Sequence, residues 1–302
     1  MTTLRTRSNR GKLVQTVGIT GANGYVGSRI AADLEAAGFR VVALVREPRP
    51  DSSDRRYALD IDHADDLLSG LDILIQCAWD MRVSVWEDVK RINIDGSIRL
   101  IDAAIKADIN RVIFISSMSA YEGCQSCYGR AKQAVESRLR TMSAAMVIRP
   151  GLIYGEQPGG IVGTLLGLAK KSPVLPMVGL GKFKLYTCHE QDLTKLVTYC
   201  CQLSEPTART MDKEILAAEP TGREFRKIVS CLAGRKLVFV PVPWRLAWFG
   251  LRVLEFLGLY IGLKSDSLIG LVKSDPCPDF SSHQHLPFSF RPLVQQTTVS
   301  TS

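Results

Sequence analysis

A glycine-rich segment between a strand pattern and a helix pattern is the feature that most constrains how this 302-residue chain folds. Residues Val14–Thr20 predict an apolar strand, and they run into the sequence Gly-Ala-Asn-Gly-Tyr-Val-Gly. Gly21 allows a tight turn, Gly24 lets the backbone approach a pyrophosphate, and Gly27 lets helix and strand pack closely. The helix that follows offers unpaired N–H groups and the positive end of its dipole, so the segment predicts a phosphate-binding loop.

Strand and helix patterns alternate from Val14 to about Pro150. Further strands are predicted at Arg40–Val45, Leu71–Ala78, Arg111–Ser116 and Ala145–Arg149. Helices are predicted between them at Tyr25–Ala37, Asp65–Leu68, Trp86–Ala107 and Tyr128–Thr141. Apolar strands that alternate with helices indicate a parallel sheet covered on both faces, so we expect an α/β fold with a doubly wound sheet over residues 14–150.

The regular alternation ends after Pro150. Glycines cluster between Gly151 and Gly160, and shorter mixed elements follow. We expect residues 151–292 to form a smaller region that covers the substrate and interleaves with the last strands of the sheet. Residues 1–13 and 293–302 are polar and are expected to be flexible tails.

The end of the second predicted strand bears on the choice of nucleotide. Dinucleotide-binding folds usually place an acid here, which bonds the ribose hydroxyls of NAD. This chain has Val45 at that point, followed by Arg46. An arginine pairs with the 2′-phosphate of NADP, and no carboxylate stands there to repel it. The residues favour NADP, with NAD as the alternative; in the competing interpretation Arg46 only ends a strand in solvent.

A tyrosine and a lysine four residues apart open the helix predicted after the Arg111–Ser116 strand. Positions four apart share a helical face, so Lys132 lies near Tyr128. A cation and an oxidised nicotinamide both favour the phenolate, so we expect the pKa of Tyr128 to be lowered. Tyr128 then exchanges a proton with a carbonyl or an alcohol while hydride moves to or from the nicotinamide. Ser117 is our first choice, and Ser119 the second, for a hydroxyl that bonds the substrate oxygen.

In this order the motifs resemble the short-chain dehydrogenase/reductase superfamily, in its extended epimerase/dehydratase branch. The resemblance covers roughly residues 14–290 and includes Arg149–Gly155 beside the nicotinamide and a late His-x-x-Asp-Leu motif at His189–Leu193. It implies a Rossmann-type fold that binds a nicotinamide cofactor. Met118 stands where epimerases of this branch often carry another hydroxyl.

The resemblance also assigns roles to individual residues. Asp60 and Ile61 correspond to the adenine contacts, Ala78 to a strand end lining the cofactor, and Asn93 to the support of an active-site water network. The implied cofactor-binding residues are Gly21, Asn23, Gly24, Tyr25, Val26, Gly27, Arg46, Asp60, Ile61, Ala78, Lys132 and Pro150. The implied catalytic residues are Tyr128, Lys132, Ser117 and Asn93.

The net charge of +8 attracts anions but does not name them. No recognition-helix or zinc-finger pattern accompanies it, so we expect no nucleic-acid partner, and anionic nucleotides account for the excess. Eight cysteines, several of them in apolar runs, and no signal-peptide pattern indicate free thiols in a reducing, cytoplasmic compartment. Cys124 and Cys127 lack a second pair at metal-ligand spacing, so we expect no metal.

The longest apolar stretch, Trp244–Leu263, has about the length that a bilayer requires. It contains Arg245, Arg252 and Glu255 on one side of a helix, and charges at a bilayer centre are costly, so we do not expect a spanning helix. Two interpretations stay open: an amphipathic helix packed on the substrate region, and a peripheral membrane contact through residues 244–263.

These patterns predict an enzyme, an NAD(P)-dependent reductase, dehydrogenase or epimerase that acts on a secondary alcohol or ketone of a small-molecule substrate. A nucleotide sugar used in polysaccharide biosynthesis is the substrate we expect first. A non-catalytic NADP(H)-binding subunit or sensor is one alternative, and a reductase of apolar carbonyl compounds is another. The resemblance also leaves a homodimer open, formed through two helices of the sheet region.

Overall fold

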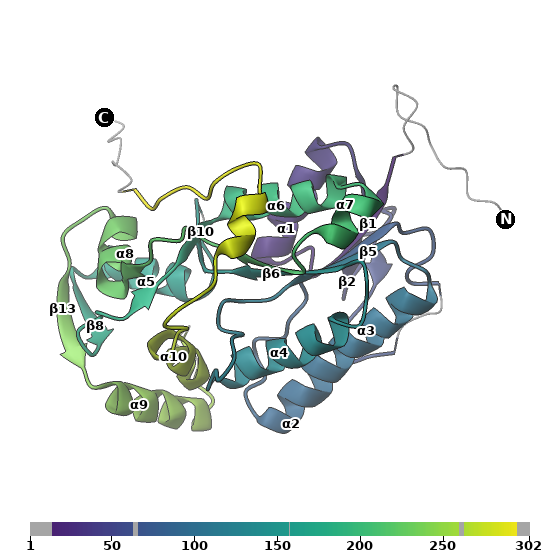
Figure 1. The fold of residues 1–302 in the computed structure, drawn as a ribbon. Coiled ribbons are helices and arrows are strands. Elements are labelled where there is room, and N and C mark those ends of the chain that lie inside the picture. Colours follow the sequence, from purple (N-terminus) through teal and green to yellow (C-terminus); the bar gives the residue numbers. More distant parts are fainter. Residues whose placement is uncertain (1–13, 63–65, 157, 260–262, 295–302) are drawn as a thin grey trace. The chain divides into compact units, whose positions relative to one another are not determined.

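The computed structural model describes residues 14–62, 66–156, 158–259 and 263–294 (Figure 1). The chain forms two compact units that exchange segments. The first, here called the sheet unit, takes the described residues up to Ser116 together with Ala131–Arg149 and Leu193–Ile215. The second unit takes Ser117–Arg130, Pro150–Asp192 and the described residues from Leu216 onward. Of the expected tails, 1–13 and 293–302, residues 1–13 and 295–302 lie outside the described residues, whereas Leu293 is buried with 1% of its surface exposed.

A seven-stranded sheet in the order β11-β6-β5-β4-β1-β2-β3 confirms the doubly wound α/β fold. Its strands are β1 (Thr16–Thr20), β2 (Arg40–Val45), β3 (Arg55–Arg56), β4 (Ile73–Gln76), β5 (Arg111–Ile115), β6 (Ala145–Pro150) and β11 (Glu214–Ala217). The strands from β3 to β6 pair in parallel along this order. The direction of winding reverses between β1 and β4, and open sheets of this kind bind ligands where such a reversal occurs.

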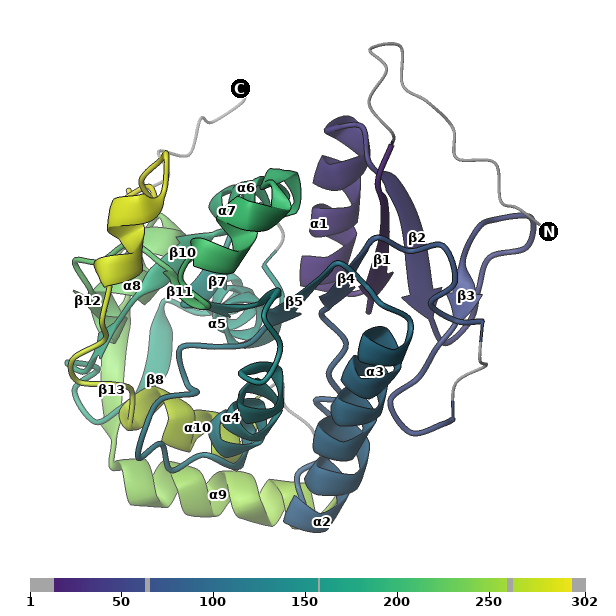
Figure 2. The same cartoon turned by 45° about the vertical axis from the view of Figure 1, so that its right-hand side comes forward.

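Helices cover both faces of the sheet because its strands are apolar on both sides. All five residues of β5 are buried, as in a strand packed on two faces. In the sheet unit, α1 (Tyr25–Ala36) is joined to α6 (Glu190–Gln202) by a hydrogen bond between Asp33 and Thr194. On the opposite face, Arg138 of α4 (Cys127–Leu139) pairs with Asp102 of α3 (Asp95–Lys106) at 2.6 Å. The two views in Figures 1 and 2 show α1 and α3 on opposite sides of the strands. The short helix α7 (Glu205–Thr210) leads into β11.

Two predicted helices differ from the observed elements. The helix expected at Asp65–Leu68 is wrong for its described part, because residues 66–70 form a turn. The helix expected at Trp86–Ala107 is interrupted: a short α2 (Trp86–Asp88) and a π-helical segment (Val89–Ile94) precede α3. Such segments occur often at functional sites, and this one carries the buried Asn93.

The second unit consists of small sheets and helices around an apolar core of its own. Three two-stranded sheets pair β7 (Leu152–Tyr154) with β10 (Thr187–His189), β8 (Val174–Val178) with β13 (Val238–Val242), and β9 (Lys184–Leu185) with β12 (Arg223–Glu224). Its helices are α5 (Gly160–Lys171), α8 (Phe225–Ala233), α9 (Trp244–Phe256), α10 (Ser265–Val272) and a 3₁₀ turn (Ser281–His285). Helix α5 packs on α8, and the core includes Leu175, Met177 and Ile228.

Candidate active site

The predicted phosphate-binding loop lies between β1 and α1, as expected. Gly21 has φ +68°, a conformation that favours glycine, and an added Cβ would lie 3.1 Å from the backbone of Ala78. A Cβ on Gly27 would lie 2.3 Å from the carbonyl oxygen of Gly21, so this glycine is needed for close packing. Helix α1 begins after Gly24 without a capping side chain in the described structure, and the positive end of its dipole favours an anion there.

Thr20 connects the loop to the neighbouring strand. Its hydroxyl accepts hydrogen bonds from the backbone nitrogens of Cys77 and Ala78, each at 3.0 Å. The backbone N–H of Gly21, the first residue of the loop, donates to the carbonyl of Leu44 near the end of β2. The ends of β1, β2 and β4 are thereby fixed to one another at the reversal point of the sheet. This cradle of glycine backbone and strand ends has the form that a dinucleotide requires.

An acidic residue that the sequence did not single out lies beside Arg46. The carboxylate of Asp80 accepts from Arg46 at 3.1 Å and from Arg82 at 2.6 Å. The amide of Asn93 bonds both the backbone nitrogen and the carbonyl of Asp80, at 2.7 and 3.0 Å. The hydrogen bond from Arg82 holds the pKa of Asp80 well below its usual range, despite partial burial. Arg46 is therefore held by an ion pair and is half exposed, and Asn93 fixes the backbone after β4.

The two residues expected to contact adenine are both exposed. Asp60 is exposed, and Ile61 has 38% of its surface exposed. Both follow the two-residue edge strand β3. Ile61 is thus an exposed apolar residue at a sheet edge, which suits contact with a planar base.

Lys132 is buried in the sheet unit, with 2% of its surface exposed. Its ammonium donates to the carbonyl of Ile115 at 2.8 Å and lies 3.9 Å from the centre of the Trp79 ring and 4.6 Å from that of Phe114. Burial lowers the pKa of Lys132 to about 7. The carbonyl and the aromatic rings favour the cation, whereas loss of water opposes it, so the charge of this lysine is finely balanced.

Tyr128 lies at the start of α4, in the second unit. Asp266 of α10 accepts from the backbone nitrogens of Cys127 and Tyr128 at 2.7 and 2.9 Å, and so fixes this end of the helix. Tyr128 and Ser117 share a hydrogen bond, and the Ser117 hydroxyl also accepts from the backbone nitrogen of Ser119 at 3.1 Å. Ser117 is the predicted hydroxyl that the structure brings to Tyr128.

The expected lowering of the Tyr128 pKa is wrong for the protein by itself. Burial raises the pKa of Tyr128 to about 12, while its hydrogen bond with Ser117 acts in the opposite direction. The loss of solvation penalises the phenolate more than spacing along a helix suggests. The phenol therefore carries its proton at neutral pH.

A buried ion pair that was not predicted supports the strand before the serine cluster. Glu136 of α4 has 1% of its surface exposed and accepts from Ser116 at 2.5 Å and from Arg149 at 2.5 Å. Arg149 also pairs with Glu214 at 3.1 Å. Ser116 is thus used to hold the helix. Pro150, which follows Arg149, is buried and accepts from the backbone nitrogen of Met118 at 3.0 Å.

The late motif is structural in the second unit. Asp192 accepts from the backbone and the side chain of Arg291 at 2.8 and 2.9 Å. His189 lies edge-on to Tyr154, with ring centres 5.0 Å apart. The contact with Arg291 ties the first turn of α6 to the last described residues of the chain, and the contact between His189 and Tyr154 joins β10 to β7.

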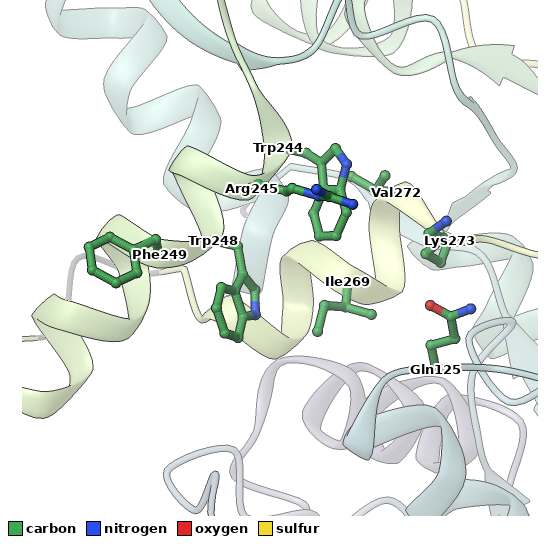
Figure 3. Close-up of a pocket in the computed structure, with 8 residues that line it drawn as sticks. All are labelled: Gln125, Trp244, Arg245, Trp248, Phe249, Ile269, Val272 and Lys273. Carbon is green, nitrogen blue, oxygen red and sulfur yellow. The ribbon is translucent and has the colours of Figure 1, made fainter.

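A cavity of about 490 Å³ lies in the second unit (Figure 3). It is lined by Gln125, Trp244, Arg245, Trp248, Phe249, Ile269, Val272 and Lys273. Gln125 comes from the loop that leads into α4, three residues before Tyr128, and the others come from α9, α10 and the residue that follows α10. Helix α10 therefore both fixes Tyr128 through Asp266 and lines a mostly apolar cavity through Ile269 and Val272.

Neither a metal site nor a spanning helix is found in the described part of the chain. No group of three or more His, Cys, Asp or Glu side chains there could hold a metal ion. Among the same residues, no helix has both the length and the apolar character to cross a bilayer. None of the eight cysteines, all of them among the described residues, forms a disulfide, and burial raises the pKa of Cys77 to about 12.

Comparison with known proteins gives one family and several relatives. Residues 17–209 match the model described as the NAD dependent epimerase/dehydratase family. Ceramide reductase of Caulobacter vibrioides is 31% identical over 194 residues, which cover 61% of this chain and 60% of the reductase. The aligned part of the chain thus spans less than two thirds of that relative's length.

Solved structures have the same fold at lower identity. The structure of MoeE5 in complex with UDP-glucose and NAD aligns with a TM-score of 0.67 and 19% identity, over 92% of this chain and 94% of that one. The structure of dTDP-4-dehydrorhamnose reductase from Bacillus anthracis in complex with NADP aligns with a TM-score of 0.62 and 17% identity, over 85% and 98% of the two chains. These likenesses extend the Rossmann-type fold over most of the chain.

Proposed function

The chain belongs to the NAD dependent epimerase/dehydratase family and is an enzyme, and from that premise we propose that it reduces a ketone to a secondary alcohol, with Tyr128 as the proton donor. One observation carries the proposal. Tyr128, the second residue of helix α4, is hydrogen-bonded to Ser117, and the buried Lys132 follows one turn later. A phenol, a hydroxyl and an ammonium in this order are the groups that carbonyl reduction requires.

The protonation state of Tyr128 supports reduction. A phenol with a pKa of about 12 holds its proton at neutral pH and can give it to a carbonyl oxygen. Ser117 donates a second hydrogen bond to that oxygen and polarises the carbonyl. A bound nicotinamide cofactor supplies the hydride. In the reverse reaction Tyr128 must first lose its proton, which burial opposes.

The cofactor fits the residues that the structure describes. The cradle of Gly21, Gly24 and Gly27 would hold the pyrophosphate, because side chains there would collide with backbone. Lys132 would bond the ribose of the nicotinamide nucleotide, and Ala78 and Pro150 would lie beside the cofactor. We propose NADP as the preferred form, because Arg46 and Arg82 carry two positive charges against the single carboxylate of Asp80, and β2 itself ends without an acid.

Two substrate classes are proposed, and the second unit supports one of them better. Its cavity is lined mainly by tryptophan, phenylalanine and aliphatic side chains. Helix α10 lines this cavity and also carries Asp266, which accepts from the backbone nitrogen of Tyr128. An apolar carbonyl compound suits such walls. The similarity to a ceramide reductase agrees with this class. A nucleotide sugar is the second class, which the fold shared with a UDP-glucose complex supports.

The decisive experiment measures NADPH oxidation with long-chain aliphatic ketones and with nucleotide keto-sugars, for the unchanged chain and for Tyr128→Phe. We expect Tyr128→Phe to lower kcat by roughly 10²–10⁴-fold, the usual contribution of an acid–base group, with NADPH affinity unchanged. Tyr199→Phe, which removes a phenol in α6, is the matched control and should retain full turnover.

Three outcomes decide between the alternatives. Equal turnover by Tyr128→Phe would refute the catalytic assignment. NADPH binding without turnover of any substrate would favour the sensor. Thermal stabilisation by UDP or dTDP but not by apolar ketones would favour the nucleotide sugar.

A further inference from the structure

Helix α9 has a second apolar face that nothing in the described structure covers. The packed face consists of Ala247, Trp248, Leu251, Leu254 and Glu255, all buried or half-buried. On the opposite side of the helix lie large apolar residues, with their exposed fractions: Leu246 65%, Phe249 62%, Val253 41%, Phe256 90% and Leu257 62%. At 100° per residue the latter five fall within a single stripe about a third of the circumference wide.

This stripe, here called the outer face of α9, is unusual for a soluble surface. Single exposed apolar residues are common, but contiguous patches of aromatic and aliphatic side chains mark an interaction site. Leu259, just beyond the helix, adds another apolar side chain with 55% of its surface exposed. Phe249, which Figure 3 shows turned away from the other cavity residues, joins the cavity to the outer face.

The charges on α9 are positive where they are exposed. Arg245 and Arg252 lie along one edge of the outer face and are exposed. Glu255, the acid of this helix, is turned inward, with 17% of its side chain exposed. Its carboxylate accepts from the backbone nitrogen and the hydroxyl of Ser265 at 2.7 and 2.9 Å, and from Arg252 at 3.4 Å. The outer face is therefore an apolar stripe with a cationic edge.

Tryptophan and lysine extend the same pattern. Trp244, at the start of α9, is 37% exposed, and the Arg245 guanidinium lies 5.7 Å from its ring centre. Lys273, which follows α10, is exposed at the cavity. Tryptophan with arginine or lysine beside an apolar helix face is the composition of helices that lie in the interface of a bilayer.

From these observations we propose that the outer face of α9 docks on an anionic lipid surface, with Phe249, Phe256 and Leu257 inserted among the acyl chains and Arg245 and Arg252 at the headgroups. The positive charge beside the outer face of α9 favours an anionic lipid surface over a second copy of the chain. A two-fold contact through α9 would bring four arginines together, with the acid of the helix already bonded inward. Phosphatidylserine or phosphatidylglycerol supplies the missing negative charge. The inference depends on this surface and is independent of the proposed reaction.

The test is co-sedimentation of the whole protein with vesicles of phosphatidylcholine that contain roughly 30% phosphatidylserine, at low and moderate salt. We expect binding to the mixed vesicles and at least tenfold weaker partitioning into pure phosphatidylcholine. The double substitution Phe256→Ser/Leu257→Ser should reduce partitioning by at least tenfold, because both side chains would be buried in lipid. Arg245→Glu/Arg252→Glu should reduce it by about fivefold per charge and weaken its salt dependence.

Leu180→Ser is the matched control. Leu180 has 61% of its surface exposed, close to the 62% of Leu257, but lies in the loop after β8. This variant should partition like the unchanged protein. Thermal melting of every variant verifies folding, and NADPH oxidation in detergent-free buffer should be retained by all of them.

Three results would overturn the proposal. The first is a failure of the unchanged protein to sediment with the mixed vesicles. The second is an equal loss of partitioning in Leu180→Ser and Phe256→Ser/Leu257→Ser. The third is a dimer in solution that Phe256→Ser/Leu257→Ser dissociates, which would assign the outer face of α9 to a second copy.

Discussion

A buried cluster around Glu136 in the sheet unit and the outer face of α9 in the second unit differ in which side chains they bury and which they expose. In the sheet unit the carboxylate of Glu136 is buried and fully paired: Glu136 has 1% of its surface exposed and accepts hydrogen bonds from Ser116 and Arg149. The second unit turns large apolar groups outward, and Phe256 has 90% of its surface exposed. Buried, satisfied charges make a rigid frame for a nucleotide, whereas exposed apolar groups are available to something outside the chain. The difference separates a cluster that stabilises the fold from a face that, in our proposal, contacts a lipid surface.

The largest expected effect tests the buried side of this comparison. Glu136→Ala leaves the guanidinium of Arg149 in the interior with Glu214 alone, so we expect a loss of about 3 kcal/mol in the free energy of unfolding. Urea denaturation measures it. Lys90→Ala breaks an exposed ion pair with Asp95 and should change stability by less than about 0.5 kcal/mol. Equal losses in the two variants would mean that burial of the pair does not matter.

The second effect concerns the nucleotide cradle. In Gly27→Ala the new methyl group would lie 2.3 Å from the Gly21 carbonyl oxygen, so the loop must open. We expect NADPH affinity to fall about 100-fold, equivalent to about 2.7 kcal/mol. Fluorescence titration with NADPH measures it. Gly167→Ala, where an added Cβ meets nothing within 4 Å, is the control and should bind NADPH normally. A Gly27→Ala variant with unchanged affinity would remove the loop from the binding site.

The third effect is a pH dependence that belongs to the sheet unit. The pKa of Lys132 is about 7 in the folded chain, against 10.5 for an ordinary lysine. Between these values the unfolded chain binds a proton that the folded chain does not, so stability rises with pH. The slope is at most about 1.4 kcal/mol per pH unit, and below pH 7 the cost of burying the cation is fully present.

Urea denaturation of the unchanged chain and of Lys132→Met at pH 7 and pH 9 isolates this contribution. The unchanged chain should gain about 2 kcal/mol more than the variant over this interval. A parallel pH dependence in the two proteins would show that Lys132 keeps its ordinary pKa in the folded state.

The smallest effect tests the exposed side of the comparison. Phe256→Ser should change the free energy of unfolding by less than about 0.5 kcal/mol, because the side chain of Phe256 is 90% exposed and its removal breaks few contacts within the protein. Leu251 is the buried residue of the same helix, and Leu251→Ala should cost about 2 kcal/mol. A marked destabilisation by Phe256→Ser would mean that the outer face of α9 supports the fold.

Sequence patterns predicted the sheet well where apolar runs were continuous. The strands β1, β2, β4 and β5 lie within the predicted ranges and β6 extends one residue beyond its range, because residues buried on both faces form a continuous apolar run. The edge strand β3 was missed, since Arg55 and Arg56 pair through backbone at an exposed edge and carry no apolar signal. The turn at residues 66–70 was predicted as a helix, because a few apolar residues fit either structure.

The candidate site was predicted where its residues are close along the chain. The spacing of Tyr128 and Lys132 and the glycines of the loop are local patterns. The partners that adjust them are distant: Asp80 lies 34 residues from Arg46, and Asp266 lies 138 residues from Tyr128. No periodicity links such pairs. The pKa of Tyr128 was predicted in the wrong direction for the same reason, since burial depends on the whole fold.

The cap that Asp266 places on α4 has a consequence for how activity can be controlled. The reactive phenol takes its position from a carboxylate on α10, and α10 packs against α9. In our proposals, contact of the outer face of α9 with a lipid surface would act through α10 on the backbone of Tyr128, the proposed proton donor. Membrane binding and turnover would then be coupled. We expect Asp266→Asn to weaken this coupling, while both the outer face of α9 and Tyr128 keep their own side chains.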